Sequence, residues 1–166
     1  MKRTTCALLV LAVTSAIPAA AQVNDEEPWA FSFAAGLADQ VAIGGAPTVS
    51  VELERYLTDA LSVGVRSGYF NKDDAVDERR DTFYGVVFGR LTWRRPGFSP
   101  FVEGGGGRYE FDDGGRRGYF AGAGAEGPQT AWGRWFGVAR YHSVERPRQG
   151  PLPDFKEAQL GLKIRF

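Results

Sequence analysis

The last twelve residues of the chain, 155–166, alternate between apolar and other side chains. The apolar positions are Ala158, Leu160, Leu162, Ile164 and Phe166, and between them stand Glu157, Gln159, Gly161, Lys163 and Arg165. A period of two predicts a β-strand with one apolar face and one polar face. Because a charge enters a dry core only with partners, the polar face must meet either water or opposite charges.

Earlier segments of the chain repeat this split between two faces. They are residues 29–37, 47–56, 61–70, 82–93, 99–111, 118–126 and 132–142, which with the last segment make eight strands. We therefore predict an all-β fold, an eight-stranded antiparallel up-and-down transmembrane β-barrel. Its outside would be apolar and its inside polar, as in bacterial outer-membrane proteins.

The alternation is less clear in two of these segments. In 82–93 two apolar sets compete, and we favour the face that carries Phe83, Val87, Leu91 and Trp93 as the outer one. In 99–111, Glu103 falls on one face while Arg108 and Glu110 fall on the other. A β-bulge within 104–107 would reconcile these charges.

The predicted connections alternate in length. Residues 58–59, 94–97 and 127–130 form short turns, whereas 71–81, 112–117 and 143–154 form longer polar loops. Short turns at one end and longer loops at the other are typical of membrane barrels, with the longer loops outside the cell.

The beginning of the chain has the pattern of a secretory signal peptide. Lys2 and Arg3 precede an apolar run over 6–17, and small residues up to Ala21 offer a cleavage site. The run is too short for a transmembrane helix, which needs about 20 residues. We predict a signal peptide over 1–21, an N-terminal tail over 22–28 and the barrel over 29–166.

Cleavage would remove the only cysteine, Cys6, so no disulfide is expected. The whole chain has 20 basic and 20 acidic side chains, and cleavage removes two of the basic ones. The slightly acidic remainder argues against nucleic acid as a partner.

The chain resembles the small OmpA/OmpX-type eight-stranded outer-membrane barrels. The terminal run from Leu160 to Phe166 is similar to the signal by which the barrel-assembly machinery recognises that family. The resemblance implies the cell outer membrane as location, and outer-membrane lipid and lipopolysaccharide as neighbours. It also implies a monomer with a non-enzymatic role in envelope structure or surface interaction, and at most a narrow porin-like conduit.

Charged residues on the expected inner faces suggest an internal ion-pair network, because eight strands leave an interior that side chains just fill. We expect its members among Glu52, Glu54, Arg66, Arg90, Glu126, Arg134, Arg140, Glu157, Lys163 and Arg165.

One alternative is an enzyme that modifies lipid A. Some eight-stranded barrels are lipid A deacylases with a His/Ser/Glu set, and His142, Ser143 and Glu157 have the matching residue types. That family places one residue between its histidine and serine and follows the serine with asparagine, whereas here the two are adjacent and Val144 follows. Neighbours on a strand point to opposite faces, so we predict no catalytic residues. A second alternative, a soluble secreted barrel that binds a small ligand, requires apolar residues inside and polar ones outside.

Other motifs suggest no cofactor and no metal. The run 104–107 is glycine-rich, but no Lys-Ser/Thr and no helix follows it, as a phosphate-binding loop requires. The acidic residues Asp73, Asp74, Asp77, Glu78 and Asp81 are interleaved with Lys72, Arg79 and Arg80, which indicates a solvated loop. Arg116 and Arg117 are weak candidates for contact with lipopolysaccharide phosphates.

Overall fold

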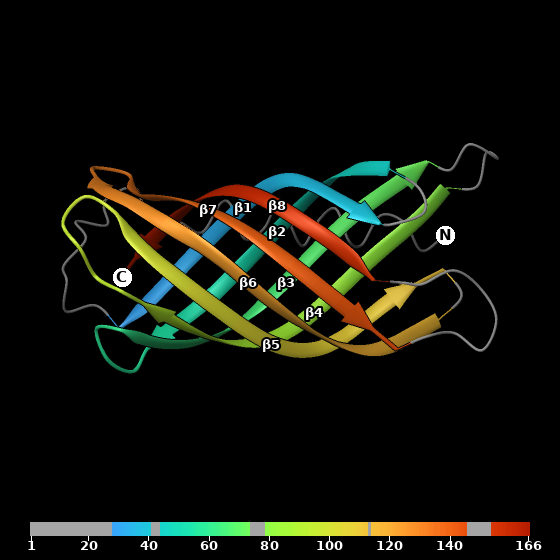
Figure 1. Ribbon diagram of the computed structural model, residues 1–166, viewed down its shortest axis with the longest axis horizontal. Coiled ribbons are helices and arrows are strands. Elements are labelled where there is room, and N and C mark those ends of the chain that lie inside the picture. The colour runs from blue at the N-terminus through green and yellow to red at the C-terminus, as the bar shows by residue number, and fades with distance from the viewer. Residues whose placement is uncertain (1–27, 41–43, 74–78, 113, 146–153) are drawn as a thin grey trace.

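The computed structural model describes residues 28–40, 44–73, 79–112, 114–145 and 154–166 as one closed antiparallel barrel (Figure 1). Each strand pairs with its neighbours in sequence, and β1 pairs with β8 to close the sheet. The strands are β1 (Trp29–Gln40), β2 (Gly44–Tyr56), β3 (Leu61–Asp73), β4 (Arg79–Thr92), β5 (Ser99–Phe111), β6 (Gly114–Thr130), β7 (Gly133–Val144) and β8 (Phe155–Arg165). The predicted fold class is confirmed. The segments predicted as signal peptide and tail lie outside the described residues, apart from Pro28.

The outer surface of the barrel is apolar. Every strand exposes at least one large apolar side chain. Among the described residues, β5, β6 and β8 expose one each, namely Val102, Tyr119 and Leu160. Leu160 in the middle of β8 is 73% exposed and Val87 on β4 is 62% exposed. The outer faces predicted for 82–93, which corresponds to β4, and for 155–166, which corresponds to β8, are confirmed. A soluble barrel would show the reverse arrangement. Among the described residues there is no helix that is long and apolar enough to cross a membrane.

The interior is only partly polar. Charged side chains lie in its middle and toward the end that carries the short turns, together with a small apolar cluster of Ala34, Phe101, Phe136 and Val138. An aromatic cluster fills the loop end. This cluster comprises Ala38, Ala46, Phe70, Tyr84, Val86, Phe88, Tyr109, Phe120, Val144 and Phe155, with Phe111 packed against it. The inward side chains Tyr84, Val86 and Phe88 explain the blurred alternation of β4, where both faces carry apolar residues.

Two local predictions were wrong, the bulge in β5 and the turn at 127–130. Strand β5 pairs without a break with β4 and with β6, so it has no bulge at 104–107. Glu103 points inward, while Arg108 and Glu110 point outward near the strand end, where charges reach beyond an apolar belt. The irregularity lies instead in β6, between Glu126 and Gln129.

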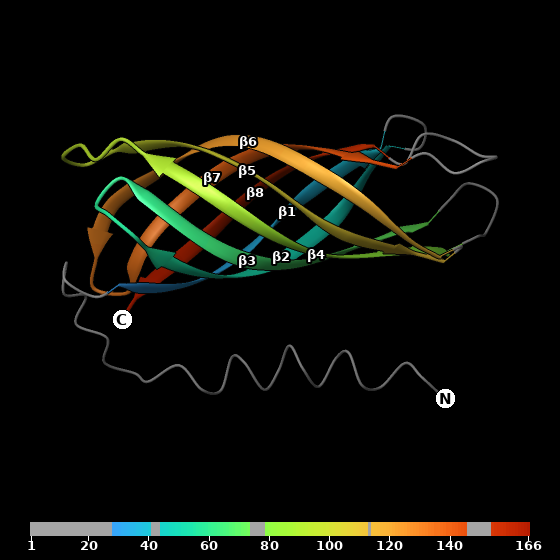
Figure 2. The same cartoon turned by 90° about the horizontal axis from the view of Figure 1, so that it is seen from below.

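The segment 127–130, predicted as a turn, therefore belongs to β6, and residues 131–132 make the turn. The described strands also run further than predicted at the loop end. In the β5–β6 hairpin only residues 112–113 separate the strands, and in the β3–β4 hairpin only 74–78 do. The strands cross the long axis of the barrel obliquely in both views (Figures 1 and 2).

Candidate functional site: the charged network inside the barrel

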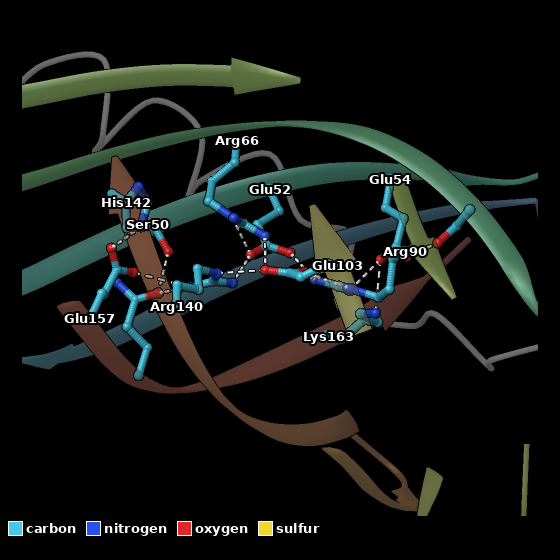
Figure 3. Close-up of polar contacts among 12 residues, drawn as sticks. Ser50, Glu52, Glu54, Arg66, Arg90, Glu103, Arg140, His142, Glu157 and Lys163 are labelled. Atoms are coloured by element: carbon cyan, nitrogen blue, oxygen red, sulfur yellow. Dashed lines mark hydrogen bonds and ion pairs between the residues drawn. The ribbon is translucent and has the colours of Figure 1, made fainter. Parts of the chain in front are cut away.

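Two carboxylates, Glu52 and Glu103, hold three arginines together in the middle of the barrel (Figure 3). Oxygens of Glu103 lie 2.7 Å from Arg66 Nη2, 2.6 Å from Arg90 Nη2 and 2.6 Å from Arg140 Nε. Oxygens of Glu52 lie 2.7 Å from Arg66 Nε, 2.9 Å from Arg90 Nη2 and 2.7 Å from Arg140 Nη2. All five side chains are fully buried, so their charges are balanced by one another rather than by bulk water.

The strand register explains why opposite charges meet. Glu52 stands opposite Arg66 across β2 and β3, and Arg90 stands opposite Glu103 across β4 and β5. Arg140 likewise stands opposite Glu157 across β7 and β8. Directly opposite residues on one face lie within reach of each other, so each cross-strand pair supplies one cation and one anion to the interior.

Aromatic rings flank the arginines on both sides of this layer. The Arg66 guanidinium lies 4.7 Å from the Phe88 ring centre and 4.8 Å from that of Phe120. The Arg90 guanidinium lies 4.5 Å from the ring centre of Phe101. These distances fit cation–π contact, which strengthens when water is excluded.

A second group of charges lies toward the short turns. The Lys163 ammonium lies 2.8 Å from Glu54 and also donates a short hydrogen bond to Glu126. Arg94, from the β4–β5 turn, reaches into the barrel and places Nη1 2.9 Å from Glu126. Partial burial acts to lower the pKa of Arg94, but the Glu126 carboxylate raises it, and the net pKa lies above its usual value. Arg94 therefore stays charged and adds a cation to the network from outside the strands.

The only histidine lies where the network meets the aromatic cluster. His142 Nδ1 is 2.9 Å from the Tyr109 hydroxyl, and Nε2 is 3.4 Å from Glu157. The Tyr84 hydroxyl donates to the same Glu157 oxygen over 2.8 Å. The His142 ring stacks on Phe155, with centres 4.2 Å apart. This contact set marks His142 as a polar link between the two halves of the interior.

Most of the predicted network residues are confirmed as members. Glu52, Glu54, Arg66, Arg90, Glu126, Arg140, Glu157 and Lys163 form buried ion pairs. Arg165 is also buried, with its guanidinium 3.9 Å from the Tyr56 ring centre. Arg134 was wrongly included, because it is only partly buried near the turn end and donates to Gln129 over 2.9 Å.

Sequence reasoning missed Glu103 and Arg94 as members of the network. The alternation in β5 does not show which of its faces points inward. The need of a buried Arg90 on β4 for an acidic partner would have favoured the face that carries Glu103. The alternation of apolar and polar residues does not predict Arg94 as a member, because Arg94 lies in a turn and its side chain enters the barrel from its end.

The residues considered for a deacylase-like site do not assemble as one. His142 and Glu157 meet inside the barrel, whereas Ser143 lies on the opposite face of β7, beside the exposed Tyr119. A nucleophile needs its base within hydrogen-bond reach, and this arrangement separates them.

The glycines 104–107 lie within β5 rather than in a loop. The described residues contain no group of three or more His, Cys, Asp or Glu that could hold a metal ion. Part of the acidic segment considered for a cation, residues 74–78, lies outside the described chain.

No protein-family model and no curated protein matches this sequence. Solved structures do match the fold. Neisserial surface protein A is similar with a TM-score of 0.67 and 12% identity, over 83% of this chain and 96% of that one. The chain has the fold of the small eight-stranded outer-membrane β-barrels. The outer membrane enzyme PagL matches with a TM-score of 0.55 and 17% identity, over 82% of this chain and 99% of that one. The outer membrane protein OprG from Pseudomonas aeruginosa matches with a TM-score of 0.53 and 10% identity, over 84% of this chain and 98% of that one.

Proposed function

We propose that this barrel is an integral protein of the bacterial outer membrane with a non-enzymatic role in envelope structure or surface interaction. The observation that carries the proposal is the reversed polarity, with exposed apolar side chains such as Leu160 around a core of buried charges such as Arg90 and Glu103. A lipid bilayer is the solvent in which that arrangement is stable, because the closed sheet leaves no strand edge unpaired. In this proposal the longer connections lie outside the cell, and the barrel-assembly machinery recognises strand β8.

The filled interior supports a closed barrel rather than a pore. The layer around Glu52 and Glu103 joins arginines from β3, β4 and β7, so it reaches across the barrel. The aromatic cluster adds a second obstruction toward the loops. A path for ions would have to break several buried ion pairs, so any conduit is narrow.

The placement of Ser143 supports a non-enzymatic role against the lipid A deacylase alternative. PagL, which shares the fold, is an enzyme, but its likeness to this chain concerns the fold alone. Here the base His142 is buried within the barrel and Ser143 is turned away from it.

Cell fractionation followed by gel electrophoresis of unheated and heated samples tests the proposal. We expect the protein in the outer-membrane fraction, with a band that changes mobility only after boiling. A soluble periplasmic protein without a mobility shift would contradict it. In planar bilayers the purified protein should give no large, steady conductance, and such a conductance would refute the closed interior.

A further inference from the structure

Two arginines stand directly opposite each other on the outer face of the barrel near the loop end. Arg108 on β5 pairs in register with Arg117 on β6, and both side chains are exposed. Like charges directly opposite on one face of a sheet destabilise it. An anion between them would remove that repulsion, and arginine is the side chain best suited to hold a phosphate through paired hydrogen bonds.

A hollow of about 580 Å³ opens at this place. Arg108, Arg116 and Arg117 line it together with Glu145 and glycines of β5 and β6. On β4, Gly85 stands opposite Arg108, and a Cβ added at Gly85 would meet nothing within 4 Å. The arginines therefore border an open space rather than a packed surface.

The carboxylates beside the hollow do not cancel its charge. Glu110 pairs with Arg108, but this pair is exposed, with side chains 72% and 46% accessible. Glu145 accepts a hydrogen bond from the Arg117 backbone amide over 3.4 Å. Exposed ion pairs contribute little stability, so a phosphate can displace Glu110 from Arg108 at small cost. Arg116 belongs to the inward face of β6, where its guanidinium lies 4.9 Å from the Phe111 ring centre, so Arg108 and Arg117 are the two arginines offered to a phosphate.

The site also lies at the depth of a lipid head group. Tyr119, two residues after Arg117 on β6, is 67% exposed, and Tyr141 on β7 is 45% exposed. Exposed tyrosines at this position correspond to the interfacial aromatic belt of a membrane barrel. Arg117 is two residues nearer the loops on the same face as Tyr119. Below it, the outward residues Gly104, Gly106 and Ala121 leave a low apolar surface.

We propose that this hollow binds the phosphorylated sugar head group of a lipid A-type glycolipid in the outer leaflet. One phosphate would lie between Arg108 and Arg117, and an acyl chain would run over the low surface beside Tyr119. More than one arginine at head-group depth fits a head group with more than one phosphate. This inference rests on the proposed outer-membrane location and names a lipid partner for it.

The test measures lipid retained by the purified, folded barrel in native mass spectrometry. The probes are bisphosphorylated lipid A, enzymatically dephosphorylated lipid A and phosphatidylglycerol at equal concentrations. We expect a one-to-one complex with bisphosphorylated lipid A that the other two lipids do not form. The double variant Arg108→Gln/Arg117→Gln should weaken binding by roughly tenfold or more, as expected for lost charge-assisted hydrogen bonds.

Matched controls separate the site from general charge and bulk. Arg95→Gln removes an exposed arginine in the β4–β5 turn and should leave binding unchanged. Gly115→Leu, at a glycine that lines the hollow and whose added Cβ would meet the Arg108 and Glu110 side chains, should obstruct the hollow and weaken binding. Gly45→Leu, at an exposed position on β2 where an added Cβ meets only one atom at 4.0 Å, should have no effect.

Each variant is first checked for the heat-dependent mobility shift of a folded barrel. Unchanged lipid A binding by a folded double variant would overturn the inference and leave the proposed function standing. Equal binding of phosphatidylglycerol would also overturn it. Wild-type protein that lacks the mobility shift and the outer-membrane location would refute the proposed function itself.

Discussion

Replacing Glu103 with glutamine removes the charge that three buried arginines share. The carboxylate contacts Arg66, Arg90 and Arg140 at 2.6–2.7 Å, and Glu52 is the only other carboxylate that reaches all three among the described residues. Glutamine keeps the size of the side chain, but its NH₂ group is a hydrogen-bond donor. It would replace one of the two accepting oxygens and would face the guanidinium groups, which are donors themselves. Removing one partner of a buried ion pair costs roughly 3–5 kcal/mol, so we expect Glu103→Gln to lower the unfolding free energy by about that amount.

The assay is urea unfolding of the barrel in lipid vesicles, followed by tryptophan fluorescence. Glu110→Gln serves as the control, because it breaks an exposed ion pair with Arg108 and should change stability by at most about 1 kcal/mol. Adding Arg66→Met to Glu103→Gln should restore part of the loss, since it removes one of the uncompensated cations. A loss below about 1 kcal/mol for Glu103→Gln, or strictly additive effects of the two changes, would refute the account of a water-excluded, coupled network.

Further predictions concern the outer face, the strand packing and the catalytic alternative. Val87→Arg places a charge on the lipid-facing surface near the middle of β4 and should lower the unfolding free energy in vesicles by roughly 2–4 kcal/mol. Leu57→Arg in the β2–β3 turn should lower it little. Equal losses for the two variants in the same urea assay would contradict the assignment of the outer face. Gly105→Ala should lower the unfolding free energy by roughly 1–3 kcal/mol, because its Cβ would stand 2.0 Å from the Val87 carbonyl oxygen. An unchanged urea concentration at the midpoint of unfolding would show that the strands move apart without cost. Ser143→Ala should leave the acylation pattern of lipid A unchanged, as measured by mass spectrometry of extracted lipid, and altered acylation would revive the enzyme alternative.

The sequence predicted the faces of most strands because alternation is a local property. In β8 the order of residues alone distinguishes Leu160 outside from Lys163 inside, and the structure confirms both. The network members could likewise be found as charges on inner faces, because a buried charge needs a partner. The pairing of particular charges depends on the register between neighbouring strands, which the turns help to set, and the alternation within one strand does not give it.

The errors have a common physical origin in positions where the alternation rule is relaxed. Arg108 and Glu110 point outward, which is tolerated because they lie near the strand end. Tyr84 and Phe88 point inward, because the loop half of the interior is packed with rings rather than charges. Sequence alone does not mark how deep a residue lies along the barrel axis, and that depth decides which rule applies.

The central claim is that the exposed apolar face of the barrel is embedded in lipid. It is tested most directly by single cysteines placed in a Cys6→Ser background, which has no other cysteine. In lipid vesicles, Leu160→Cys should resist a membrane-impermeant maleimide, and a bimane label at that position should be quenched by brominated lipid. Leu57→Cys, in the turn and 52% exposed, should react with the maleimide once the vesicles are permeabilised and should escape the lipid quencher. Reaction of Leu160→Cys as fast as that of Leu57→Cys would contradict a barrel with its apolar face in the membrane.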